Sequence, residues 1–224
     1  MPDGRRHLVV LLHGAGGVPA DMAPIAEALP SSATGVSLPG RLPLGDRYAW
    51  ADVHRSDPAG IAASAAAVAA WTDAQPGASS VGLVGFSQGA AVALEMLRAR
   101  PDRYAYVVTL SGFLAGARDP RDPGVRAVRP PVLCCHGGTD DVIPPSWTDR
   151  LERWLDRCAT PTVRRYPGLG HTMDAAEVAD VVRFVERTAP GHRPGPAAGP
   201  GRIGAAGLPW VDGGRPPGGR GGSP

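Results

Sequence analysis

Residues 80–99, SVGLVGFSQGAAVALEMLRA, combine an apolar run, a glycine-flanked serine and an alanine-rich stretch in one continuous segment. The apolar run predicts a buried strand, and residues 90–99 are typical of a helix. Gly85 and Gly89 bracket Ser87, and a Gly-x-Ser-x-Gly pentapeptide between a strand and a helix predicts a sharp turn with the serine at its tip. We therefore take Ser87 as a candidate nucleophile.

Strands and helices alternate on both sides of this segment. Apolar runs predict further strands at 7–12, 34–38, 104–110, 131–135 and 162–166, and helical spacing predicts helices at 19–29, 59–74, 146–157 and 172–187. This alternation predicts an α/β fold, a mostly parallel sheet of about six strands with helices on both faces. The remaining long segments, 39–58 and 111–130, are predicted as loops.

The composition divides the chain at residue 190. Residues 1–189 are long enough for one domain, which we expect to hold the whole sheet. Residues 190–224 are rich in Pro, Gly and Arg and hold few apolar anchors, so we expect a disordered tail. The alternative is that the short apolar stretch 208–211, LPWV, docks on another surface.

Charge and cysteine content narrow the class of protein. The chain has 23 basic and 21 acidic residues, a net charge of +2, so neither a nucleic-acid partner nor stable membrane insertion is expected. Its three cysteines, Cys134, Cys135 and Cys158, form no disulfide pattern and are typical of buried thiols in a reducing compartment. We expect a cytoplasmic protein, because no apolar stretch is long enough for a signal sequence or a membrane span.

A nucleophilic serine needs a histidine base, and the histidine needs a carboxylate that orients it. After such a serine turn the order along the chain is acid and then histidine. His171 lies in a glycine-rich loop between the last predicted strand and helix, and we take it as the base; His136, at a strand end, is interpreted as structural. Asp140 and Asp141 both follow the fifth strand, and spacing alone leaves the choice between them open.

Two backbone N–H groups are also needed to bind the oxyanion of an acyl-transfer reaction. One donor is expected from Gln88, directly after the serine. The second is expected from the loop His13-Gly14-Ala15-Gly16-Gly17 after the first strand, with Ala15 as the donor. A phosphate-binding glycine loop is the alternative, but the segment lacks both the usual glycine spacing and a P-loop lysine.

Taken together, the motifs resemble the phospholipase/carboxylesterase family of α/β-hydrolases, which includes the acyl-protein thioesterases. The matching stretches are LLHGAGG, GFSQGA, LSGFL, CHGGTDDVIP and YPGLGHTM, and the resemblance runs from about residue 7 to residue 187. It implies the α/β-hydrolase fold and favours Asp140 over Asp141 as the acid. It also implies a substrate pocket that includes Trp50, Phe113 and Leu114.

The predicted function is that of a serine hydrolase acting on carboxylic esters or thioesters through an acyl-enzyme, with Ser87, Asp140 and His171 as the triad. Its substrate is expected to be a small-molecule ester, an acyl thioester or an acylated protein, without a metal or cofactor. We expect a monomer or a homodimer. The alternatives are a serine peptidase or amidase on the same fold, and an inactive binding module.

Overall fold

The computed structural model describes residues 6–53, 57–116, 119–190, 202–203, 208 and 210. Within them lies one parallel sheet whose strands follow the order β8-β7-β6-β5-β1-β2-β9. Six of its strands come from residues 1–189, as predicted, and the seventh has only two residues. The strands are β1 (Arg6–Leu12), β2 (Ala33–Leu38), β5 (Ala78–Phe86), β6 (Tyr106–Leu110), β7 (Pro131–Gly137), β8 (Thr160–Tyr166) and β9 (Arg202–Ile203).

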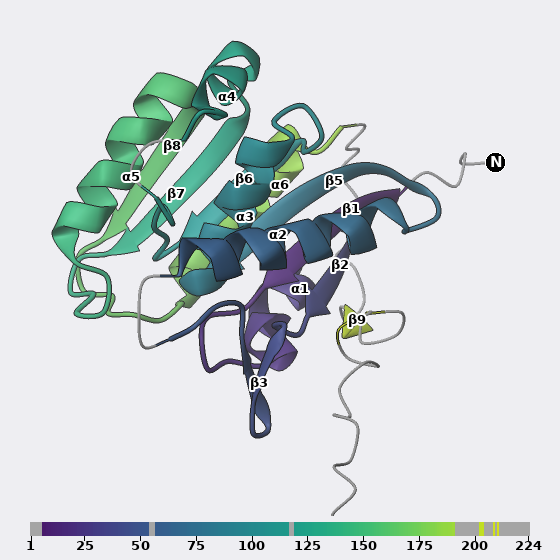
Figure 1. Cartoon of the computed structure of the whole chain (residues 1–224), viewed down its shortest axis with the longest axis horizontal. Helices are drawn as coiled ribbons and strands as arrows, with labels where there is room; N and C mark the ends of the chain where they lie inside the picture. Colours follow the sequence, from purple (N-terminus) through teal and green to yellow (C-terminus); the bar gives the residue numbers. More distant parts are fainter. Residues whose placement is uncertain are drawn as a thin grey trace, which may run out of the picture.

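Helices cover both faces of this sheet. In Figure 1, α2 and α3 cross in front of the strands, and α6 lies behind them. The front layer comprises α2 (Pro58–Asp73), α3 (Gln88–Ala99), α4 (Asp122–Val128) and α5 (Pro145–Cys158). The back layer comprises the 3₁₀ helix η1 (Pro19–Met22), α1 (Ala23–Ala28) and α6 (Ala175–Thr188).

The sequence of strand β1 shows why the sheet lies between two layers of helices. Val10 and Leu12 pack in the core under the front helices, whereas Val9 and Leu11 pack in the core under the back helices. All four side chains are completely buried. Alternate residues of a strand point to opposite faces, so a central parallel strand needs a continuous apolar sequence.

The structure contains two elements inside the segments that we predicted as loops. Strands β3 (Leu42–Leu44) and β4 (Arg47–Ala49) form an antiparallel hairpin, and Gly45 turns the chain with φ of +68°. Every residue of β3 is exposed, so no buried apolar pattern marks it in the sequence. The second element is α4, a single short helix that begins with Asp-Pro-Gly, a sequence of weak helix formers.

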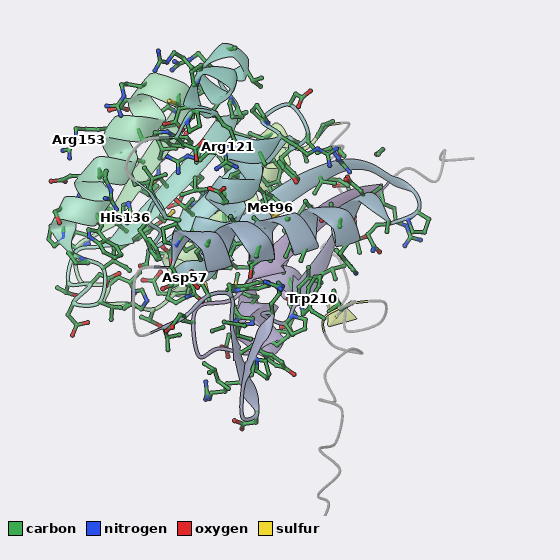
Figure 2. The ribbon with its side chains drawn as sticks, in the orientation of Figure 1. Asp57, Met96, Arg121, His136, Arg153 and Trp210 are labelled. Atoms are coloured by element: carbon green, nitrogen blue, oxygen red, sulfur yellow. The ribbon has the colours of Figure 1, made fainter. Side chains whose placement is uncertain are left out.

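Part of the segment predicted as a disordered tail lies on the domain. Strand β9 pairs with β2, and Leu208 is completely buried in the front core. The indole Nε1 of Trp210, labelled in Figure 2, donates a hydrogen bond to the Pro39 carbonyl at 3.4 Å. These two side chains match the docking alternative for 208–211. The rest of 190–224 lies outside the described residues, and there disorder stays a prediction.

The three cysteines are buried and form no disulfide, as expected. None of the helices among the described residues combines the length and the hydropathy needed to span a bilayer.

Glu177 on α6 is an unusual member of the back layer. Its side chain is 1% exposed, and neither carboxylate oxygen has a hydrogen-bond partner among the described residues. Burial, reinforced by the charges of Asp174 and Asp180, raises the pKa of Glu177 to about 8. The folded protein therefore holds a proton that the unfolded chain, with a glutamate pKa near 4.5, releases.

We predict that Glu177→Gln stabilises the protein above pH 8 and has little effect near pH 4.5. The stability that the wild type gains from the protonated carboxyl is complete below the unfolded pKa and is lost as pH rises towards 8. The glutamine amide of the variant carries no charge at any pH. The free energy of unfolding at pH 8.5 should therefore be higher than that of the wild type by roughly 1–3 kcal/mol. Thermal unfolding at both pH values tests this, with Glu186→Gln at an exposed position of α6 as the control. A gain that does not change with pH would contradict the prediction.

Candidate active site

Ser87 lies between the end of β5 and the start of α3, in the conformation predicted for the tip of a sharp turn. Its backbone has φ of 53° and ψ of −117°, a region that residues with a side chain rarely adopt. Its N–H donates to the Leu110 carbonyl at 2.8 Å, which fixes the turn to the end of β6. The side chain is 8% exposed and lines a hollow at the carboxyl end of the sheet.

The two glycines beside Ser87 are required by close backbone contacts. A Cβ atom at Gly85 would lie 2.4 Å from the backbone of Gly89. A Cβ atom at Gly89 would lie 2.2 Å from the Leu12 carbonyl oxygen at the end of β1. The turn therefore packs against the neighbouring strand without room for a side chain on either flank.

The structure brings His171 and Asp140 to Ser87. His171 Nε2 lies 3.0 Å from Ser87 Oγ, and His171 Nδ1 lies 2.8 Å from Asp140 Oδ2. The other oxygen of Asp140 accepts the backbone N–H groups of Val142 and Ile143, each at 2.9 Å. Both contacts to His171 are hydrogen-bond distances, so the three side chains form a continuous chain of polar contacts.

Asp140 is held in its ionised form. Burial alone would raise its pKa, but the hydrogen bonds from His171 and from the Ile143 backbone outweigh this effect and lower the pKa. Asp141, the alternative left open by spacing, is exposed and makes none of these contacts. Of the two aspartates, Asp140 is therefore the one that contacts His171.

His136 lies apart from this chain of contacts. It is 4% exposed, and its Nε2 lies 3.1 Å from Cys134 Sγ. Burial lowers the pKa of His136 to about 4, so the imidazole is neutral at physiological pH. Its placement agrees with the structural role that we inferred from its position at a strand end.

The glycine loop after β1 lies against Ser87. A Cβ atom at Gly14 would lie 3.4 Å from Ser87 Cβ and 2.9 Å from the Phe86 ring. Among the described residues, the backbone N–H groups of Ala15 and Gln88 donate no hydrogen bond. Ala15 and Gln88 both line the hollow beside Ser87, so the two donors predicted for an oxyanion are unpaired next to the serine.

The hairpin that we predicted as a loop holds this glycine segment in place. The Gly16 N–H donates to the Tyr48 carbonyl at 2.9 Å, and the Tyr48 N–H donates to the Gly17 carbonyl at the same distance. The buried His13 ring accepts from the Gly40 N–H at 3.0 Å through Nε2, and burial lowers its pKa. The sequence shows a histidine in this loop, but nothing in it indicates that the ring anchors a segment 27 residues away.

Gln88 has a second role that we did not predict. Its side-chain Oε1 accepts the backbone N–H of Trp50 at 2.7 Å, and its Nε2 donates to the Ala51 carbonyl at 3.1 Å. The glutamine therefore connects the serine turn to the segment that precedes α2. The sequence shows a glutamine at the start of a predicted helix. If its amide is buried, it needs a hydrogen-bond partner, but the sequence does not indicate which residue provides it.

Two hollows flank the serine. The first, about 660 Å³, contains Ser87, Gln88 and Ala15 and extends past Phe113 and Leu114, two residues expected in the pocket. The second, about 1010 Å³, contains His171 and Ala15 and extends between α1 and α6 over apolar side chains that include Val178 and Val182. Ala15 borders both, so the site has one open side next to the serine and another next to the histidine.

Trp50 was expected to line the substrate pocket, and the structure contradicts this expectation. The structure buries it completely, and it does not line the hollow that contains Ser87. Its indole Nε1 donates to the His13 carbonyl at 2.8 Å, because the ring faces inward against the glycine loop. The pocket wall at this position is formed instead by Ala51, Asp52 and Val53.

The sequence is similar to those of known proteins. A family model described as phospholipase/carboxylesterase matches residues 2–189. Acyl-protein thioesterase 1 of Saccharomyces cerevisiae is 29% identical over 109 residues, which is 46% of this chain and 48% of that protein. The chain thus spans about half the length of this curated relative.

Solved structures share the fold. A carboxylesterase from Mesorhizobium loti superposes with a TM-score of 0.69 at 24% identity, over 80% of this chain and 88% of that one. Acyl-protein thioesterase 2 from Zea mays superposes with a TM-score of 0.61 at 25% identity, over 84% of this chain and 96% of that one. On the family match and the shared fold, this chain belongs to the phospholipase/carboxylesterase family of α/β-hydrolases.

Proposed function

We propose that the protein hydrolyses carboxylic esters or thioesters through an acyl-enzyme formed on Ser87. The observation that carries the proposal is the chain of contacts from Ser87 Oγ through His171 to Asp140, with distances of 3.0 and 2.8 Å. A serine hydroxyl becomes an effective nucleophile when a base accepts its proton, and the base works when a carboxylate fixes its tautomer.

In the acylation step, Ser87 Oγ attacks the acyl carbonyl carbon while His171 Nε2 takes its proton. The resulting imidazolium is stabilised by the ionised Asp140 at Nδ1. The imidazolium then donates its proton to the leaving oxygen or sulfur, and the bond to the leaving group breaks. Water, deprotonated by the same histidine, attacks the acyl carbonyl carbon. The bond between this carbon and Ser87 Oγ then breaks, His171 returns the proton to Oγ, and the carboxylic acid is released.

The unpaired N–H groups of Ala15 and Gln88 supply the oxyanion site in this proposal. Both line the hollow beside Ser87, and Gln88 is the first residue of α3, whose N-terminus carries partial positive charge. The negative charge on the former carbonyl oxygen is greatest in the transition state. Fixed donors at this place therefore lower the barrier more than they strengthen substrate binding.

We assign the two halves of the substrate to the two hollows on chemical grounds. The leaving group must receive its proton from His171, so it belongs in the hollow that His171 lines, between α1 and α6. The acyl group then occupies the hollow that contains Ser87, Phe113 and Leu114. Both volumes lie near the range of small-molecule sites, 300–1,000 Å³.

The kind of leaving group follows from the relatives. Solved neighbours are named carboxylesterases and, from Zea mays, acyl-protein thioesterase 2, and the yeast sequence relative is named acyl-protein thioesterase 1. We infer the same reaction class here, with a small-molecule ester, an acyl thioester or an acylated protein as the substrate. Cleavage of amides in preference to esters would instead indicate the serine peptidase or amidase alternative.

We further infer a cytoplasmic protein that is a monomer or a homodimer. The three buried cysteines without disulfides support a reducing compartment. Light scattering after size-exclusion chromatography measures the oligomeric state directly.

We predict that Ser87→Ala lowers kcat about a millionfold, as loss of the nucleophile does in triad enzymes. Wild type and variant are compared on p-nitrophenyl esters and acyl thioesters from acetyl to palmitoyl. Ser146→Ala, at an exposed position near the start of α5, is the matched control and should keep full activity. Equal turnover by wild type and Ser87→Ala would exclude Ser87 as the nucleophile. A wild type that hydrolyses none of these substrates and does not react with a fluorophosphonate would favour the binding-module alternative.

The two adjacent aspartates give a second prediction. Asp140→Asn should lower kcat about ten-thousandfold, because the amide no longer fixes the histidine tautomer or stabilises the imidazolium. Asp141→Asn should stay within about twofold of wild type, since its side chain is exposed and makes no contact with His171. The pair is assayed on one ester, with thermal unfolding to check the fold. Equal losses in both variants would show that the effect is not specific to the carboxylate at His171.

A further inference from the structure

The hollow assigned to the acyl group contains an arginine without an acidic partner. Arg150 on α5 lines the same hollow as Ser87. Among the described residues, no carboxylate oxygen lies within 4.0 Å of its guanidinium. Two other arginines on this side of the sheet do have acidic partners: Arg98 pairs with Asp122 at 3.0 Å, and Arg121 pairs with both Glu95 and Asp119.

The guanidinium of Arg150 is nevertheless held in place. Its Cζ lies 5.7 Å from the centre of the Trp147 ring, which itself packs against Phe113 at 5.1 Å between ring centres. Its Nη2 donates to the Leu114 carbonyl at 3.2 Å. Trp147, Phe113 and Leu114 all line the hollow, so one wall presents a fixed cation on an aromatic stack.

The hydrogen-bonding capacity of this guanidinium is largely unused. Nε is buried without a partner, and Nη1 makes no hydrogen bond among the described residues. Arginine stays protonated in proteins and offers five donors, of which the structure uses one. Because Nε is enclosed and Nη2 already donates to Leu114, Nη1 is the donor left for a ligand. A charge-assisted hydrogen bond from this partly dehydrated cation to an anion such as a carboxylate is stronger than one to a neutral group.

The acidic residues that border the same hollow form no ion pair with Arg150 among the described residues. Asp57, labelled at the N-terminal end of α2 in Figure 2, accepts the Gly60 N–H at 2.9 Å and the Asp52 N–H at 3.1 Å. Its carboxylate is thus used to cap the helix. Asp52 also lines the hollow.

We propose that the acyl group of the substrate carries a second, negatively charged carboxylate, and that Arg150 binds this group at the far end of the hollow. The inference rests on the proposed function, because it takes the hollow beside Ser87 as the acyl site. The substrate class is then the half-esters and half-thioesters of dicarboxylic acids. Arg150 acts as a specificity residue and takes no part in bond breaking.

The kinetic test compares acyl groups of equal length with and without the terminal charge. Adipoyl, pimeloyl and suberoyl thioesters of N-acetylcysteamine are paired with the hexanoyl, heptanoyl and octanoyl thioesters. We expect wild type to prefer the charged member by roughly 10- to 100-fold in kcat/KM for at least one length, as a charged hydrogen bond implies. Arg150→Met should abolish this preference, because kcat/KM for each charged substrate falls to the level of its neutral partner in the same variant.

Two further variants control the comparison. Arg150→Lys keeps the charge without the fork and should retain part of the preference. Arg153→Met removes a cation from the same helix, at an exposed side chain that points away from the molecule in Figure 2, and should behave as wild type. A wild type that hydrolyses both members of each pair equally, or a charge preference that survives Arg150→Met, would overturn the proposal.

A binding measurement separates this proposal from the catalytic one. Calorimetry on Ser87→Ala compares the monomethyl esters of the same dicarboxylic acids with the corresponding methyl alkanoates. Tighter binding of the charged ligands that is lost in Ser87→Ala/Arg150→Met supports the role of Arg150 even if no ester is turned over. Equal binding of both ligand sets overturns it, whether or not Ser87 proves to be the nucleophile.

Discussion

The close approach of the serine turn to strand β1 is the constraint on which the site depends. Gly89 lies so near the Leu12 carbonyl that a Cβ atom there would be 2.2 Å from the oxygen. This packing forces Ser87 into a left-handed φ, a conformation that costs on the order of 1–3 kcal/mol and that the surrounding sheet must stabilise. The same contact brings the end of β1, and the glycine loop that follows it, beside the serine.

The parallel sheet brings the other two candidate residues to the serine. Ser87, Asp140 and His171 follow β5, β7 and β8, and every one of these strands ends at the same edge. Residues separated by 31 and 84 positions in the chain therefore meet within hydrogen-bond distance. The back layer under this edge tolerates the buried and unpartnered Glu177, because the large apolar core on both faces supplies the stability of the domain.

A second network shapes the space around the serine. The Gln88 side chain holds the backbone at Trp50 and Ala51, and the Trp50 indole holds the His13 carbonyl. Because these groups are buried and hydrogen-bonded to one another, they connect the segment before α2 to the glycine loop and to the serine turn. The two hollows have different lining residues apart from Ala15, so the acyl and leaving groups have different surroundings in the proposed reaction.

The sequence by itself determined the parallel α/β fold, the serine turn and the candidates Ser87, His171 and Asp140 or Asp141. The periodicity of strands and helices, the glycine spacing and the order of residues along the chain can be read directly from the sequence. They predict local structure without knowledge of how distant segments pack. Tertiary structure decided which surfaces border the site. The hairpin under the glycine loop, the inward turn of Trp50 and the position of Arg150 on the pocket wall depend on contacts between distant segments. No local pattern encodes such contacts, because they arise only when separate strands and helices pack together.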